Sequence, residues 1–153
     1  MAKLAPGDAA PDFTMNDADG NTWRLGDLRG KKVILFFYPA DDTPGCTAEA
    51  CDFRDARAEL ADAGYVVLGA SPQGAKSHAA FATKFRLNFP LLIDEDMSVA
   101  QAYAAAGDLG DYKGIPLRVI RSTFVINEEG VIRHALYGVN ARSHVAELQA
   151  VLV

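Results

Sequence analysis

Two cysteines five residues apart are the side chains of this sequence best suited to chemistry. Cys46 and Cys51 are the only cysteines, and Cys46 follows the run Thr43-Pro44-Gly45. Threonine is a favoured N-cap, and proline fits the first helical position because its missing N–H would have no partner there. The run therefore predicts a helix that begins at Thr43 and carries Cys46 in its first turn. Free backbone N–H groups and the positive end of the helix dipole favour a thiolate at that place.

The start of a helix stabilises a thiolate only weakly. A helix terminus contributes about 0.3–1 kcal/mol, and up to ~2 kcal/mol in a partly buried site. Three acidic residues close in sequence, Asp41, Asp42 and Glu49, would oppose a thiolate. We therefore expect the fold to supply a cation, and the candidates are Arg118 and Arg121, which border a predicted strand.

The three histidines are far from Cys46 along the chain. His78, His134 and His144 are expected to be packing or surface residues. Because separation in sequence does not fix separation in space, a cysteine–histidine hydrolase stays open at this point.

Helical spacing separates the two cysteines. Cys46, Phe53 and Leu60 recur every seven residues and should share a stripe that faces the core, whereas Cys51 lies on a half-polar row with Asp55. Five helical residues turn through about 500° and rise about 7.5 Å, which places the Cα atoms roughly 8–9 Å apart. A disulfide tolerates about 7 Å. A static Cys46–Cys51 bond is therefore not expected, and a transient one requires the first turn of the helix to unwind.

Composition excludes several classes of function. The 153 residues are 50% hydrophobic and 23% charged, with a net charge of −5 and no long basic run. This balance fits one globular domain over residues 1–153 and disfavours nucleic acid or an anionic membrane as partner. The sequence has no apolar stretch of about 18 residues and no apolar signal-peptide core. We expect a cytoplasmic protein.

No cofactor or metal site is predicted. A metal site built on Cys46 and Cys51 would need a second pair of Cys or His ligands, and the sequence has no such pair with ligand spacing. The glycines at 107, 110 and 114 do not form a phosphate-binding loop and indicate a flexible connection.

The segments around the cysteines alternate between strand and helix patterns. The apolar run at 31–38 indicates a strand covered on both faces, Gly64 ends the helix that holds the cysteines, and the turn at 128–130 joins a hairpin. The predicted strands are 12–16, 22–25, 31–38, 65–70, 90–93, 121–127 and 131–137, and the predicted helices are 43–63, 74–86, 98–105 and 143–152. This order predicts an α/β fold with a central mixed sheet flanked by helices.

The chain resembles the peroxiredoxins. The pattern Pro39-x-x-x-Thr43-x-x-Cys46 reproduces the active-site signature of that family, and residues 121–126 resemble the strand that supplies its arginine. A second cysteine five residues after the first resembles the Q-type, or bacterioferritin-comigratory, subclass. The similarity runs from residues 7–13 to the last helix, and one departure is Asn127, where the family often has Asp.

The resemblance implies a thioredoxin-like fold with extra N-terminal strands and a role for each site residue. Cys46 would attack the peroxide O–O bond and become a sulfenic acid. Thr43 would hydrogen-bond the peroxide, Arg121 would hold the thiolate and the peroxide oxygens, and Pro39 would shield the sulfur from water. Cys51 would then condense with the sulfenic acid to form a disulfide.

The resemblance also implies partners. The substrates would be hydrogen peroxide and small organic hydroperoxides, and a dithiol such as thioredoxin or a glutaredoxin-type reductant would recycle the disulfide. The subclass is expected to be a monomer or a dimer. Two other functions stay open, namely a protein disulfide oxidoreductase, although the Cys-x-x-Cys spacing is absent, and a redox sensor that passes oxidation to a partner protein.

Overall fold

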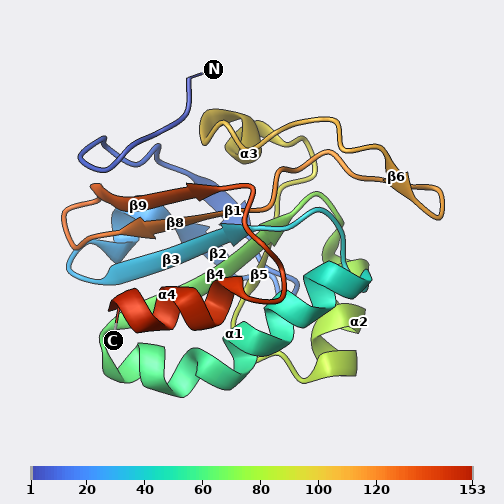
Figure 1. Ribbon diagram of the computed structural model, residues 1–153, viewed down its shortest axis with the longest axis horizontal. Helices are drawn as coiled ribbons and strands as arrows, with labels where there is room; N and C mark the ends of the chain where they lie inside the picture. The colour runs from blue at the N-terminus through green and yellow to red at the C-terminus, as the bar shows by residue number, and fades with distance from the viewer. Residues whose placement is uncertain (1, 153) are drawn as a thin grey trace.

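A five-stranded mixed sheet forms the centre of the computed structural model, which describes residues 2–152 (Figure 1). The strand order is β5-β4-β3-β8-β9, in which β3, β4 and β5 are parallel, β8 is antiparallel to β3, and β9 is antiparallel to β8. The strands are β3 (Lys32–Phe37), β4 (Tyr65–Ser71), β5 (Leu91–Ile93), β8 (Ser122–Ile126) and β9 (Ile132–Tyr137). The predicted mixed sheet and the hairpin of its last two strands are confirmed.

Helices cover the sheet on both faces, because the side chains of β3 alternate between two apolar clusters. Ile34 and Phe36 point into the cluster under α1, α2 and α4, whereas Val33, Leu35 and Phe37 point into the cluster under α3 and the N-terminal segment. The helices are α1 (Pro44–Asp62), α2 (Ala75–Phe85), α3 (Ser98–Ala102) and α4 (His144–Leu152). In Figure 1, α1 and α4 lie below the sheet and α3 lies above it.

The extra N-terminal strands are confirmed as a small separate sheet. β1 (Thr14–Asn16) pairs antiparallel with β2 (Thr22–Arg24), and a short 3-10 helix follows at Leu25–Leu28. Phe13, Met15 and Leu25 from this segment are buried in the cluster under α3.

The long helix α1 begins and ends at the predicted places. Pro44 occupies its first turn, and Gly64 adopts φ +91° just beyond its end, a left-handed conformation that glycine tolerates without steric cost. Cys46, Phe53 and Leu60 are all buried, which confirms the core-facing stripe. α1 thereby fixes the first turn, with Cys46, against the underside of the sheet.

Two segments differ from the sequence-based expectations. The stretch predicted as a loop contains a small antiparallel hairpin, β6 (Asp111–Tyr112) with β7 (Ile115–Pro116), that extends away from the body of the molecule (Figure 1). α3 ends three residues early, since Ala104 has φ +57°. Among residues 2–152, no helix is long and apolar enough to cross a membrane.

Candidate active site

Cys46 lies in the first turn of α1 with a guanidinium group beside its sulfur. Arg121 immediately precedes β8, and its Nη2 donates to Cys46 Sγ at 3.5 Å. The Cys46 residue is only 1% exposed, and the Arg121 side chain is 17% exposed. A guanidinium this close to the sulfur would stabilise negative charge on it. The predicted cation is therefore present.

Arg121 is also held by a buried acid on the next turn of α1. Its Nη1 donates to Glu49 Oε1 at 2.9 Å, while Glu49 Oε2 is buried and has no hydrogen-bond partner in the described residues. Burial raises the pKa of Glu49 to about 7, against the lowering effect of Arg121, and Asp52 raises it slightly further. Burial acts to lower the pKa of Arg121, but the charges of Cys46 and Glu49 raise it overall.

This arrangement changes the expected role of Glu49. The sequence suggested that its charge would oppose a thiolate, whereas the structure shows its side chain bonded to the guanidinium that contacts the sulfur. The Glu49 carboxyl group therefore holds Arg121 in the position from which its other terminal nitrogen contacts the sulfur. Glu49 is thus a supporting residue that sequence analysis misread.

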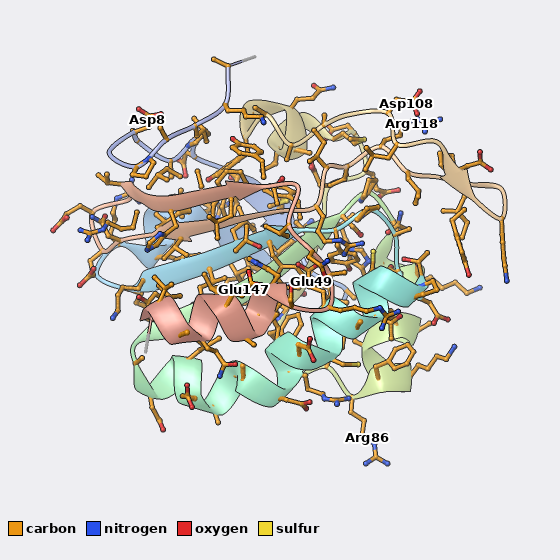
Figure 2. All side chains as sticks on the ribbon, in the orientation of Figure 1. Asp8, Glu49, Arg86, Asp108, Arg118 and Glu147 are labelled. Carbon is orange, nitrogen blue, oxygen red and sulfur yellow. The ribbon has the colours of Figure 1, made fainter. Side chains whose placement is uncertain are left out.

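Arg118, the alternative cation, lies elsewhere. Its Nη1 donates to Asp108 Oδ1 at 3.0 Å and to the carbonyl oxygen of Gly110 at 2.8 Å. In Figure 2, Arg118 and Asp108 lie together near the protruding hairpin, well away from Glu49 on α1. Of the two candidate arginines, the structure therefore brings Arg121 to Cys46.

Gly45 allows the arginine to approach. A Cβ atom at this position would lie 3.0 Å from Arg121 Nη2 and 3.4 Å from the Cβ of Ala141. Any larger side chain would force the guanidinium away from the sulfur or displace the helix start. Sequence analysis missed this requirement, because it treated the glycine only as part of a helix-start pattern.

Thr43 occupies the N-cap position, but its side chain does not cap the helix. Its backbone is extended, with φ −97° and ψ 155°, and its hydroxyl donates to the carbonyl oxygen of Ala40 at 2.8 Å rather than accepting from a first-turn N–H. The expected position is confirmed and the local capping bond is not. The N–H groups of the first turn are left without this side-chain acceptor, and the lone pairs of the hydroxyl can accept a hydrogen bond from a ligand.

Cys51 has a different environment on the same helix. It is half-buried, and α1 continues without interruption from Cys46 to Cys51. Both cysteines are free thiols. Burial raises the pKa of Cys51, Arg54 acts to lower it, and Asp55 and Asp52 raise it. Cys51 therefore lacks the electrostatic support for a thiolate that Cys46 receives.

The two aspartates that precede α1, Asp41 and Asp42, form their contacts with residues other than Cys46. Asp41 is buried and bonded to His78, with 2.6 Å between its Oδ2 and the ring Nδ1, while Asp42 forms an exposed ion pair with Lys84 at 2.8 Å. The expectation that both oppose the thiolate as free charges is therefore not met.

The buried histidines have other partners than Cys46. His78 Nε2 contacts the Leu92 carbonyl oxygen at 2.9 Å, and His144 Nε2 contacts Thr123 Oγ1 at 2.7 Å. Burial lowers the pKa of His144. Within residues 2–152, no histidine nitrogen is hydrogen-bonded to Cys46, and this arrangement disfavours a cysteine–histidine hydrolase.

Comparison with known proteins points the same way as the geometry. A model of the AhpC/TSA family matches residues 6–135. A Mycobacterium tuberculosis protein named as a candidate peroxiredoxin is 49% identical over 147 residues, which cover 96% of this chain and 94% of that protein.

Solved structures resemble the whole fold. The crystal structure of peroxidoxin BcpB from Mycobacterium tuberculosis superposes with a TM-score of 0.84 at 34% identity and covers 96% of this chain and 95% of its own. A bacterioferritin comigratory protein from Xanthomonas campestris, described for its alkyl peroxide reduction activity, has a TM-score of 0.84 at 31% identity and covers 92% and 89% of the two chains. The thioredoxin-like fold is thereby confirmed.

Proposed function

The chain belongs to the AhpC/TSA family of peroxiredoxins, in the bacterioferritin-comigratory or Q-type group, and on that premise we propose that Cys46 reduces hydrogen peroxide and small organic hydroperoxides. Family membership implies a thiol peroxidase. The observation that supports the finer assignment is the contact of Arg121 with both Cys46 Sγ and Glu49. The alkyl peroxide activity described for the Xanthomonas campestris relative supports the inclusion of organic hydroperoxides.

In the first step, the Cys46 thiolate attacks one peroxide oxygen. The O–O bond breaks, the sulfur gains that oxygen as a sulfenic acid, and the other oxygen leaves with the electron pair and takes a proton to become water or an alcohol. The guanidinium N–H groups of Arg121 stabilise the negative charge as it moves from sulfur to the leaving oxygen.

In this proposal Thr43 orients the peroxide and Pro39 shields the sulfur from water. The Thr43 hydroxyl already donates its proton to Ala40, so toward a peroxide it acts as acceptor for the O–H group. The peroxide is then held from two sides, because it donates to Thr43 and accepts from Arg121. Pro39 is buried beside this segment and keeps water from the sulfur.

In the second step, the Cys51 thiol condenses with the sulfenic acid. The S–O bond breaks, a Cys46–Cys51 disulfide forms, and the oxygen leaves as water. Since α1 is continuous between the two residues, its first turns must unwind for the sulfurs to meet. An external dithiol of the thioredoxin or glutaredoxin type then restores both thiols by exchange.

Steady-state turnover tests the proposal. The reduced protein should consume hydrogen peroxide continuously when thioredoxin, thioredoxin reductase and NADPH are supplied, and a parallel glutaredoxin system identifies the better reductant. Cys51→Ser should consume one equivalent of peroxide and then stop. Cys46→Ser should consume none above the blank.

Two outcomes would contradict the proposal. One is persistence of both thiols for minutes in stoichiometric peroxide, and the other is unimpaired thioredoxin-dependent turnover in Cys51→Ser. Insulin reduction separates the proposed peroxidase, which should be nearly inactive in that assay, from a protein disulfide oxidoreductase. We also predict that the protein is a monomer or a dimer, which sedimentation would test, and that it is cytoplasmic, which cell fractionation would test.

A further inference from the structure

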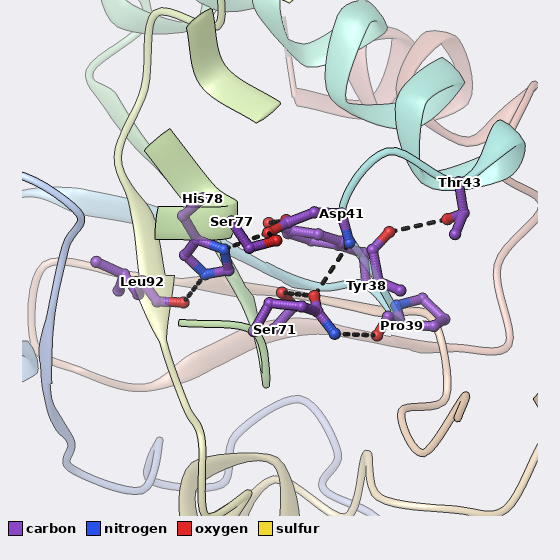
Figure 3. Close-up of polar contacts among 10 residues, drawn as sticks. Tyr38, Pro39, Asp41, Thr43, Ser71, Ser77, His78 and Leu92 are labelled. Atoms are coloured by element: carbon purple, nitrogen blue, oxygen red, sulfur yellow. Dashed lines mark hydrogen bonds and ion pairs between the residues drawn. The ribbon is translucent and has the colours of Figure 1, made fainter. Parts of the chain in front are cut away.

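A buried polar cluster next to the site has no part in the mechanism above. The Asp41 carboxyl group is hydrogen-bonded to three side chains, as Figure 3 shows. Tyr38 OH donates to Oδ1 at 2.6 Å, Ser77 Oγ donates to Oδ2 at 2.7 Å, and His78 Nδ1 lies 2.6 Å from Oδ2. His78 is fully buried and Asp41 is 8% exposed.

The hydrogen-bond partners of His78 indicate where the protons of its ring lie. The Leu92 carbonyl can only accept, so His78 Nε2 must carry a proton. Burial, helped by the Asp41 charge, raises the pKa of Tyr38 well above its usual value, so the phenol keeps its proton and donates. One further proton lies between Asp41 and His78 Nδ1. The 2.6 Å contact is therefore a short hydrogen bond between the two side chains.

The same cluster ties down the main chain between β3 and α1. The Asp41 N–H donates to Gln73 Oε1 at 3.0 Å, and Gln73 Nε2 donates to the Pro39 carbonyl oxygen at 3.3 Å. Ser71, at the end of β4, donates to the same Gln73 oxygen at 2.7 Å. The strand next to β3 therefore holds this segment from below, while α2 holds it through His78 (Figure 3).

This segment also contains a residue in the left-handed backbone region. Asp42 has φ +58°, a conformation that is uncommon for non-glycine residues, although aspartate adopts it more readily than most. Asp42 lies between Asp41, whose side chain and N–H are both bonded, and Thr43, whose hydroxyl is bonded to Ala40. A shift of the segment would move Thr43 and Pro39 relative to Cys46.

We propose that Asp41 and His78 are positioning residues for the peroxide reaction, which act by holding the segment from residue 38 to residue 42 in the conformation that presents Pro39 and Thr43 at Cys46. The inference rests on the roles proposed above for Thr43 and Cys46. Asp41 and His78 do not touch the peroxide. Their contribution is geometric, and misplacement of an orienting group by about 1 Å can lower a rate by about 100-fold.

Two substitutions of His78 separate its two hydrogen bonds. His78→Asn places an amide N–H close to the position of Nδ1 and keeps a donor for Asp41. His78→Gln places the amide close to the position of Nε2, which keeps the bond to Leu92 and loses the one to Asp41. We expect the rate constant for Cys46 oxidation by hydrogen peroxide to fall about 10–100-fold in His78→Gln, and His78→Asn to recover a large part of that loss.

A second readout distinguishes positioning from a general structural role. Alkylation of Cys46 by iodoacetamide depends on thiolate and access, but needs neither Thr43 nor an oriented peroxide. Its rate should stay within about twofold in His78→Gln, whereas partial unfolding would expose the buried Cys46 and accelerate it. Lys84→Gln is the matched control, since it removes the exposed pair with Asp42 and the contact of the ammonium with the Phe85 ring, and it should leave both rates within about twofold.

A double-variant cycle with Thr43→Val completes the test. If the pair acts through Thr43, His78→Gln should lower the peroxide rate much less in the Thr43→Val background than in the natural sequence. The proposal is overturned by a peroxide rate within twofold of the natural protein in folded His78→Gln, by equal losses of peroxide and alkylation rates, or by fully additive effects. If His78→Gln fails to fold, Asp41→Asn and Ser77→Ala take its place with the same readouts. Failure of the natural protein to react with peroxide would instead reject the proposed function.

Discussion

The two cysteines lie on the same helix, α1, but their surroundings differ. Cys46 is buried in the first turn, with Arg121 at 3.5 Å from its sulfur and a buried acid that orients the arginine. Cys51 is half-buried five residues later, and burial with two nearby aspartates raises its pKa. The reactivity proposed for Cys46 therefore depends on Arg121, which immediately precedes β8, and on the start of α1. Cys51 has neither of these neighbours.

Removing the guanidinium of Arg121 should erase most of the difference in reactivity between Cys46 and Cys51. In Arg121→Gln, we expect the rate constant for Cys46 oxidation by hydrogen peroxide to fall about 100–1000-fold, the usual effect of losing one donor that stabilises transition-state charge. Arg118→Gln is the matched control, because Arg118 bonds to Asp108 on the protruding hairpin, and its rate should be unchanged. First-turnover stopped-flow kinetics measures both, and equal effects of the two substitutions would contradict the assignment of Arg121.

The buried acid beside Arg121, Glu49, should make the free energy of unfolding depend on pH. The pKa of Glu49 in the folded protein is about 7, above its ordinary value of 4.5, so the folded state holds this proton more tightly than the unfolded state. The stability due to that proton is complete below about pH 4.5 and is lost as the pH rises through about 7. The loss is about 3 kcal/mol at most, from 1.36 kcal/mol per pKa unit.

Glu49→Gln has no such proton to lose. Its free energy of unfolding should therefore fall less than that of the natural protein between about pH 5 and pH 8. Urea unfolding of the reduced proteins across this range measures the difference, and Glu129→Gln, at an exposed position in a turn, provides a control. Parallel pH profiles for Glu49→Gln and the natural protein would show that Glu49 is ionised throughout.

Adding one methyl group should weaken the arginine contact partially. In Gly45→Ala the new Cβ lies 3.0 Å from Arg121 Nη2, so the guanidinium must move by a few tenths of an ångström. We expect a fall of about 10-fold in the peroxide rate constant, smaller than that of Arg121→Gln. Gly110→Ala, just before β6, is the control for a loss of stability. Its φ of +80° disfavours alanine, so this substitution should destabilise the protein without touching Arg121. A rate equal to that of the natural protein would mean that Arg121 adjusts without cost.

A change beside Cys51 should have the smallest effect. Asp55 raises the pKa of Cys51 and also bonds to Arg54 at 2.9 Å. In Asp55→Asn, alkylation of Cys51 by iodoacetamide near pH 7.5 should become about twofold faster, as exposed charge pairs are weak. Alkylation of Cys46 should not change, and mass spectrometry of the two labelled peptides reports both rates in one sample. An equal change at both cysteines would indicate a shared environment.

Local signals made much of the fold predictable. The continuous apolar run of β3, the Thr43-Pro44 start of α1 and the glycine at its end each follow from short-range stereochemistry. The hairpin β6–β7 was missed because its strands have only two residues each and lack an alternating apolar pattern. Its formation depends on turn geometry at the glycines, which composition alone does not show.

The sequence brought Cys46 and Arg121 together, but it did not show all of the contacts around them. The resemblance of residues 121–126 to the family's arginine strand favoured Arg121, whereas charge alone does not separate Arg121 from Arg118. In the structure, Arg121 directly precedes β8, whereas Arg118 follows the β6–β7 hairpin and bonds to Asp108. The partners of Glu49 and Asp41 lie 72 and 37 residues away in sequence, so an acid that looks repulsive along the chain is paired in space.

The most direct measurement locates the first sulfur to be oxidised. Reduced Cys51→Ser and Cys46→Ser proteins are mixed with substoichiometric hydrogen peroxide in the presence of dimedone, which captures sulfenic acids, and the labelled peptides are identified by mass spectrometry. We predict a rapid adduct on Cys46 in the first protein and no comparable adduct on Cys51 in the second. Equal labelling of the two cysteines, or labelling of Cys51 alone, would contradict the assignment of the reaction to the first turn of α1.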